Sequence, residues 1–145
     1  MHIRPMARRA LAGLLVVGLW LPLAAQGERD QSKSTRGRRM VEIRSYNLKP
    51  GTRDRFHERF IKEALPLLKQ AKVDVVAYGP SLHDRDSYYL MRGYASLDDR
   101  QQSEDAFYGS DAWKRGPREA VLADIESYTT VVIALDASTV GGLRR

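Results

Sequence analysis

The sequence contains no cysteine, and this absence excludes several classes of site. A chain without thiols forms no disulfide, has no thiolate nucleophile, and provides no ligand for iron–sulfur clusters or for cysteine-containing zinc sites. Histidine is also scarce, with three residues in a chain of 145. The composition is 43% hydrophobic and 29% charged, which is typical of a folded protein and too apolar for a wholly disordered one. This length suits a single domain.

Residues 1–25 lack acidic side chains and have the three parts of a secretory signal peptide. A basic start is followed by an uncharged stretch from Ala10 that ends in small residues at Ala25. The stretch is shorter than the ~20 residues that cross the hydrocarbon core of a membrane. We therefore expect cleavage after Ala25 or Gly27, and a periplasmic or secreted protein with no stable transmembrane segment. The alternative is an uncleaved N-terminal membrane anchor.

Most of the excess positive charge precedes the predicted domain. The formal net charge is +6, but from residue 40 onward basic and acidic side chains are equal in number. Residues 26–39 contain Arg, Ser, Gly and Gln and almost no apolar side chains, which predicts a flexible basic linker. Because the domain itself is neutral, we expect no nucleic-acid partner.

Residues 40–136 have the hydrophobic pattern of a domain with the element order βαββαβ. Alternating or β-branched segments predict strands, and spacings of three and four predict helices; the predicted strands are 40–48, 73–83, 88–95 and 126–135. Pro66 lies inside the first helical pattern, so we expect a kink or a break before Leu67. Ser96 and Asp99 resemble a capping box at the start of the second helix. We expect residues 137–145 to be a Gly-containing tail.

This order predicts an α+β domain in which two helices cover one face of a four-stranded antiparallel sheet. The strands, however, have apolar side chains on both faces, as Leu90 and Met91 or Val131 and Val132 illustrate. An uncovered second face would expose more apolar surface than monomers usually do. We therefore predict a two-fold symmetric homodimer in which the sheets pack face to face.

Residues 41–51, with the sequence VEIRSYNLKPG, resemble the opening of the NIPSNAP family domain. Residues 88–94 (YYLMRGY) and the segment around Trp113 are similar to the family's later strand and second helix, although Arg92 stands where a Trp or Leu is common. The resemblance covers about residues 40–135. It implies a ferredoxin-like fold that pairs as a dimeric α/β barrel. It implies little chemistry, and the secretory signal sets this chain apart from the mitochondrial members.

Seven side chains are candidates for contact with a small ligand. Arg44 and Tyr46 share one strand face with Glu42, and together they suit an anionic or phenolic ligand. The structural alternative for this row is a cross-strand ion pair or a dimer contact. The other candidates are His83 in a turn and a set of residues predicted between sheet and helices: Tyr78, Tyr88, Arg92 and Trp113. The structural alternative for the aromatic members of this set is the core, where such residues are more often found.

The sequence has no nucleophile with its base, no phosphate loop and no metal-ligand pattern, so we expect neither a metal nor a cofactor. His57 is expected on the protein surface. We predict non-catalytic binding of an apolar or aromatic ligand or of a protein. One alternative is a cofactor-independent monooxygenase-type or haem-related enzyme, and another is a pure interaction module. A closed pocket of ~300 Å³ or more with convergent polar groups would favour an enzyme, whereas filling by Phe56, Phe60 and Trp113 would disfavour it.

Overall fold

The computed structural model describes residues 37–144, so the predicted signal peptide and linker residues 26–36 lie outside the described residues. The described part contains an antiparallel sheet with the strand order β2-β3-β1-β4. Its strands are β1 (Arg38–Leu48), β2 (Asp74–Pro80), β3 (Ser87–Tyr94) and β4 (Ile125–Asp136). The predicted four-stranded ferredoxin-like sheet is therefore confirmed. β1 begins before the predicted boundary, so Arg38 and Arg39 belong to the strand and not to the linker.

The first helical segment runs from β1 to β2 and contains the irregularity expected from Pro66. It consists of α2 (Arg53–Arg59), the π-helical turn η1 (Phe60–Ala64) and α3 (Leu65–Gln70). In the π turn the amide of Leu65 donates to the carbonyl of Phe60. A π turn just before a proline relieves the clash that the proline ring causes in a regular helix. The helix is thus widened and not broken.

The second helical segment joins β3 to β4 and consists of α4 (Leu97–Gly109), α5 (Asp111–Lys114) and α6 (Arg118–Ala123). The Ser96 hydroxyl accepts the amide of Asp99 at 3.1 Å, and the Asp99 carboxylate accepts the amide of Ala95 at 2.7 Å. The predicted reciprocal cap therefore forms, with its return bond one residue earlier than in a standard capping box.

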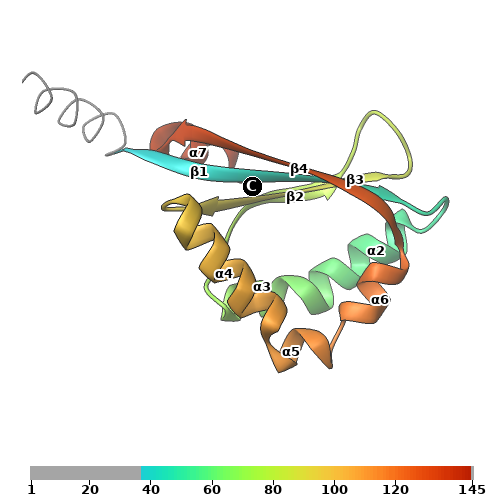
Figure 1. Ribbon diagram of the computed structural model, residues 1–145. Helices are drawn as coiled ribbons and strands as arrows, with labels where there is room; N and C mark the ends of the chain where they lie inside the picture. Colours follow the sequence, from blue (N-terminus) through green and yellow to red (C-terminus); the bar gives the residue numbers. More distant parts are fainter. Residues whose placement is uncertain (1–36, 145) are drawn as a thin grey trace, which may run out of the picture. The chain divides into compact units, whose positions relative to one another are not determined.

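Helices α2 to α6 lie on one face of the sheet (Figure 1). The main core lies between these helices and the sheet, where Leu48, Tyr88 and Leu90 from the strands pack with Phe56 and Phe60 from the first helical segment. These strand residues occupy even-numbered positions, in agreement with the alternation of a β-strand. Within residues 37–144, no helix combines the length and apolar character needed to cross a membrane.

The opposite face of the sheet carries a further helix, α7 (Ala137–Leu143) (Figure 1). Val140, which is 2% exposed, packs there with Val41 and Val76 in a second, smaller core. Two arginines secure the same end of the sheet, since Arg39 and Arg144 both pair with Asp74 at 2.7–2.8 Å. One expectation is thereby corrected, since residues 137–143 form a helix and not a tail. The two predicted helical segments share one face of the sheet, and α7 adds an unpredicted helix on the other face (Figure 1).

Beyond α7, this opposite face is partly apolar and partly polar, the polar part including Ser45 and Thr129. Val131, Ile43 and Met91 are direct neighbours across β4, β1 and β3. Val131 is 51% exposed, and Ile133, on the same face of β4, is 36% exposed. The apolar surface that led to the homodimer prediction is therefore present, but it is smaller than a wholly uncovered face.

Candidate functional site

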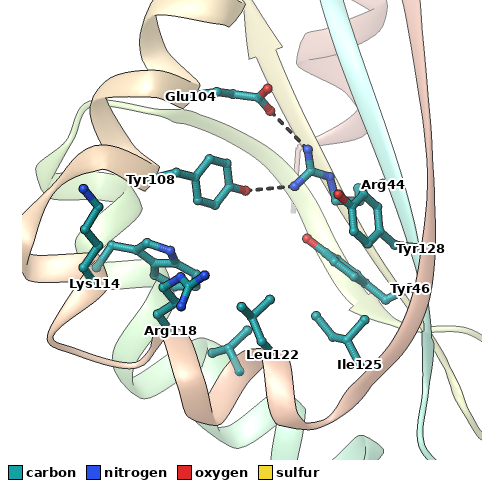
Figure 2. Close-up of a pocket in the computed structure, with 11 residues that line it drawn as sticks. Arg44, Tyr46, Glu104, Tyr108, Lys114, Arg118, Leu122, Ile125 and Tyr128 are labelled. Atoms are coloured by element: carbon teal, nitrogen blue, oxygen red, sulfur yellow. Dashed lines mark hydrogen bonds and ion pairs between the residues drawn. The ribbon is translucent and has the colours of Figure 1, made fainter.

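An open pocket of about 650 Å³ lies between β4 and the helices α4, α5 and α6 (Figure 2). Its walls combine four aromatic rings, three aliphatic side chains and four charged groups. The lining residues are Arg44, Tyr46, Glu104, Tyr108, Trp113, Lys114, Arg118, Val121, Leu122, Ile125 and Tyr128. A wall of this kind suits a small molecule with an apolar body and a polar group.

This pocket lies beside the main core and not at its centre. Phe56, Phe60 and Trp113 are 1%, 4% and 6% exposed. Between them and their neighbours only a cavity of about 30 Å³ remains. Phe56, Phe60 and Trp113 therefore fill the centre of the domain, which disfavours an enzyme with a central pocket. A larger space with polar groups opens next to this filled centre.

A buried ion pair between the two central strands lies behind the pocket. Glu42 of β1 and Arg92 of β3 are direct cross-strand partners, and Arg92 Nη2 lies 2.5 Å from Glu42 Oε1. Their side chains are 0% and 1% exposed. The structural alternative for Glu42, a cross-strand ion pair, is thus what the structure shows. Arg44 Nη2 makes a longer contact of 3.1 Å with the same Glu42 oxygen.

Helix α4 completes this network with three polar residues spaced by four, which places them on one helix face. Glu104 Oε1 accepts from Arg92 Nη2 at 2.6 Å and from Arg44 Nη2 at 3.2 Å. Arg100 donates to Glu42 Oε2 at 2.5 Å and lies 3.0 Å from Glu104 Oε2. The third residue is Tyr108. With three guanidinium groups and two carboxylates, the network has an excess of one positive charge when both glutamates are ionised.

The two glutamates of the network have pKa values that move in opposite directions. Burial opposes ionisation of Glu42, but its hydrogen bond with Glu104 and the charges of Arg92 and Arg44 lower its pKa to about 2. Burial and the hydrogen bond with Glu42 raise the pKa of Glu104. When the network takes up a proton, we therefore expect Glu104, which lines the pocket, to bind it first.

Hydrogen-bond donors converge at the polar end of the pocket (Figure 2). The Tyr108 hydroxyl accepts from Arg44 Nη1 at 2.9 Å and from Arg92 Nη1 at 3.1 Å, which leaves its own O–H to donate. Arg44 Nη1 carries a second hydrogen beyond the one given to Tyr108. Tyr46 stays a neutral phenol, because burial and the neighbouring Tyr108 raise its pKa to about 12. This end of the pocket therefore suits an acceptor group, and its positive charge favours an anion.

Aromatic rings hold the Arg44 guanidinium in place. Its central carbon lies 5.1 Å from the ring centre of Tyr128 and 5.9 Å from that of Tyr108. Contacts at these distances are attractive for a cation near a ring face. The orientation of Arg44 is thus fixed by aromatic residues from two different elements, β4 and α4.

The structure separates the seven predicted candidates into two groups. Arg44, Tyr46 and Trp113 line the pocket, and Arg92 lies directly behind it. The other three candidates line a separate surface hollow of about 680 Å³ around the β2–β3 loop: Tyr78, His83 and Tyr88.

His57 was expected on the surface, but it is half-buried. Its Nδ1 lies 2.8 Å from the Tyr88 hydroxyl, within hydrogen-bond distance. The histidine therefore connects α2 to β3 at the edge of the core, with part of its side chain exposed.

Several residues of the pocket and of the ion-pair network were not predicted from the sequence. Arg100, Glu104 and Tyr108 were missed, as were the cations Lys114 and Arg118 at the rim. The signal for the first three is their spacing of four on a helix with a single buried apolar residue, Phe107. A helix that packs on a sheet through such a polar stripe requires a matching polar row, and the predicted row at Glu42 and Arg44 supplies it.

Comparison with known proteins places the fold and the family. The structure is similar to a NIPSNAP family protein from Agrobacterium tumefaciens strain C58, with a TM-score of 0.63, 20% identity, and coverage of 68% of this chain and 87% of that chain. It is also similar to a second protein of this family from the same organism, with a TM-score of 0.62, 20% identity, and coverage of 68% of this chain and 88% of that chain. For a NIPSNAP domain protein from Burkholderia xenovorans the TM-score is 0.61 and the identity is 16%, with coverage of 68% of this chain and 95% of that chain. No curated protein matches the sequence. The NIPSNAP family model matches residues 41–135, and the chain therefore belongs to the NIPSNAP family.

Proposed function

We propose that this protein binds a small organic anion with an aromatic or aliphatic body in the pocket beside β4. The observation that carries this proposal is the pair of donors formed by Arg44 Nη1 and the Tyr108 hydroxyl, 2.9 Å apart, at the edge of a network with excess positive charge. The aromatic and aliphatic walls around Trp113 and Ile125 provide the surface for the body of the ligand. A carboxylate is the simplest group that accepts from both donors.

Among the three arginines of the network, Arg44 is the one suited to hold a ligand. Arg92 is 1% exposed and makes contacts of 2.5 and 2.6 Å with both glutamates. Arg44 is 12% exposed, lines the pocket, and makes longer contacts of 3.1 and 3.2 Å with the same carboxylates. Arg92 therefore positions the network, whereas Arg44 can share its charge with an incoming anion.

We propose binding without catalysis. Glu104 is the single carboxylate among the described residues that line the pocket. Both of its oxygens contact guanidinium groups, those of Arg92 and Arg44 on one side and that of Arg100 on the other. Both oxygens are thus engaged within the network, and a ligand would have to displace an arginine contact to reach either of them, which disfavours a role as general base toward the ligand.

Calorimetric titration with cinnamate and with its neutral amide tests this function. Wild-type protein should bind cinnamate and bind the amide more weakly, because the amide lacks the charge. Arg44→Gln should weaken cinnamate binding by about tenfold or more, the effect expected from losing a charge-assisted hydrogen bond. Arg44→Lys keeps the charge and should lose less. Arg115→Gln is the control, since Arg115 is exposed and pairs with Asp111 outside the pocket. Equal binding of cinnamate to wild-type and Arg44→Gln protein, or conversion of cinnamate to a product, would contradict the proposal.

We also propose that the functional form is an exported homodimer. The apolar surface at Val131 and Ile133 supports sheet-to-sheet pairing, because a patch of this kind on a free monomer would face water. Sedimentation velocity should give a dimer for the wild type and a monomer for Val131→Glu. Leu97→Glu, which replaces an exposed leucine at the start of α4, is the matched control and should stay dimeric. A monomeric wild type would contradict this part of the proposal.

Export rests on the sequence of residues 1–25. Expression of the full chain in a bacterium, followed by N-terminal sequencing, should give a mature chain that begins after Ala25 or Gly27. A full-length protein that stays with the membrane after an alkaline wash would indicate the uncleaved anchor instead.

A further inference from the structure

The pocket has a second pair of cationic side chains, which a ligand bound only at Arg44 would not contact. Lys114 ends α5 and Arg118 begins α6, and both line the pocket across from Arg44 (Figure 2). Their neighbour Arg115 pairs with Asp111 at 2.6 Å. Within the part of the chain that the structure describes, Lys114 and Arg118 have no ion-pair partner. Two cations without partners at the rim of a pocket are available to a ligand.

No acidic residue of the pocket neutralises this rim. Glu104 already contacts guanidinium groups at the far end of the network. Between the two cationic ends, apolar side chains line the pocket, among them Leu122 and Ile125 (Figure 2). The pocket therefore alternates from positive to apolar to positive along its length.

We infer that the ligand is a dianion with an acidic group at each end of an apolar body, of which a dicarboxylic acid is the simplest form. This inference rests on the proposed function. One acidic group accepts from Arg44 and Tyr108, and the other lies between Lys114 and Arg118. The two ends differ in kind: Arg44 is held by aromatic rings and carboxylates, whereas the rim cations are exposed to water. The rim should therefore add charge attraction that is sensitive to salt.

Titration calorimetry of the full chain with matched acids tests this inference. The pairs are benzoate with terephthalate, cinnamate with para-carboxycinnamate, and decanoate with sebacate, in which the second acid adds one carboxylate to the first. At low salt, at least one diacid should bind about tenfold more tightly than its monoacid, the sum of two exposed charge contacts. High salt should reduce this ratio to about twofold or less.

Variants assign the added affinity to the rim. In Lys114→Gln/Arg118→Gln protein the diacid should lose its advantage over the monoacid, whereas Arg115→Gln should keep the wild-type ratio. Both changes are on exposed side chains, and unfolding curves should confirm that each variant folds. A diacid that binds no better than its monoacid in the wild type overturns the inference, as does a ratio that survives in the double variant. In both cases, monoacid binding that depends on Arg44 would leave the proposed function standing. If neither acid binds, the proposed function fails as well.

Discussion

Glu42 and Arg92 face each other across β1 and β3 and form an ion pair of 2.5 Å with neither side chain reaching solvent. A buried pair is costly to break, because removing one partner leaves the other as an uncompensated charge. This pair is also the point where the sheet meets α4, since Arg100 and Glu104 contact the same two groups. It therefore connects the stability of the domain with the shape of the pocket.

The first prediction concerns this pair. Glu42→Gln and Arg92→Met should each lower the free energy of unfolding by about 3–5 kcal/mol, the usual cost of leaving a buried charge without its partner. The double variant should lose less than the sum of the two single losses. Urea unfolding of the four proteins measures the coupling. Additive losses would show that the two side chains do not depend on one another.

The second prediction concerns stability in acid. The pKa of Glu42 is about 2 in the folded protein, whereas a glutamate in an unfolded chain has an ordinary pKa of 4.5. As pH falls, the unfolded chain therefore takes up this proton first. The stability that the ionised carboxylate provides is complete above about pH 4.5 and is lost as pH falls toward about 2. Asp124 acts in the same direction, because the hydrogen bond from Arg55 outweighs burial and lowers the pKa of its carboxyl. The free energy of unfolding, measured with urea at several pH values in this range, should change less steeply with pH in Glu42→Gln than in the wild type. An equally steep change in both proteins would contradict the prediction.

The third prediction concerns the pH dependence of ligand binding. Burial and Glu42 raise the pKa of Glu104, which lines the pocket. Protonation removes a negative charge next to Arg44, so the affinity for cinnamate should rise as pH falls through this pKa. Titrations from about pH 8 downward measure the dependence, over the range in which cinnamate stays largely ionised. Glu104→Gln should bind cinnamate with little change over this range. A wild type whose affinity increases with pH would contradict the assigned role.

The fourth prediction compares two buried tyrosines of β3. Tyr88 and Tyr94 are 1% and 2% exposed. The Tyr88 hydroxyl lies 2.8 Å from His57 Nδ1, whereas the Tyr94 hydroxyl has no partner among the described residues. Tyr88→Phe should therefore destabilise the protein by about 1 kcal/mol, and Tyr94→Phe should leave its stability unchanged or increase it. Thermal unfolding of both variants decides this, and a larger loss for Tyr94→Phe would indicate that its hydroxyl has a partner.

The strands and main helices could be predicted because their signals are local. Alternation in β1 put Glu42, Arg44 and Tyr46 on one face, and the structure places all three on the face that meets the helices. Helix α7 could not be predicted in the same way. Its sequence, ASTVGGL, has two glycines and a single buried residue, Val140. Its position depends on contact with Val41 and Val76, which are distant in sequence.

The candidate site was predicted only on its strand side. Arg44 and Tyr46 were identified from their shared face, whereas Glu104 and Tyr108 lie on a helix that is polar on most sides. Which polar face of such a helix meets the sheet is decided by the ion pairs to Arg92 and Arg44, and these pairs join residues far apart in the chain. Tyr78 at the end of β2 and His83 in the β2–β3 loop line a separate hollow and not this pocket.

A crystal structure of the protein with para-bromocinnamate shows whether an organic anion binds at Arg44 and Tyr108, since anomalous scattering from bromine locates the ligand independently. We predict that a carboxylate oxygen lies within about 3 Å of both Arg44 Nη1 and the Tyr108 hydroxyl, with the ring against Trp113 and the bromine toward the rim at Lys114 and Arg118. A ligand bound in the hollow beside the β2–β3 loop, or absent from the Arg44 pocket at saturating concentration, would contradict the account.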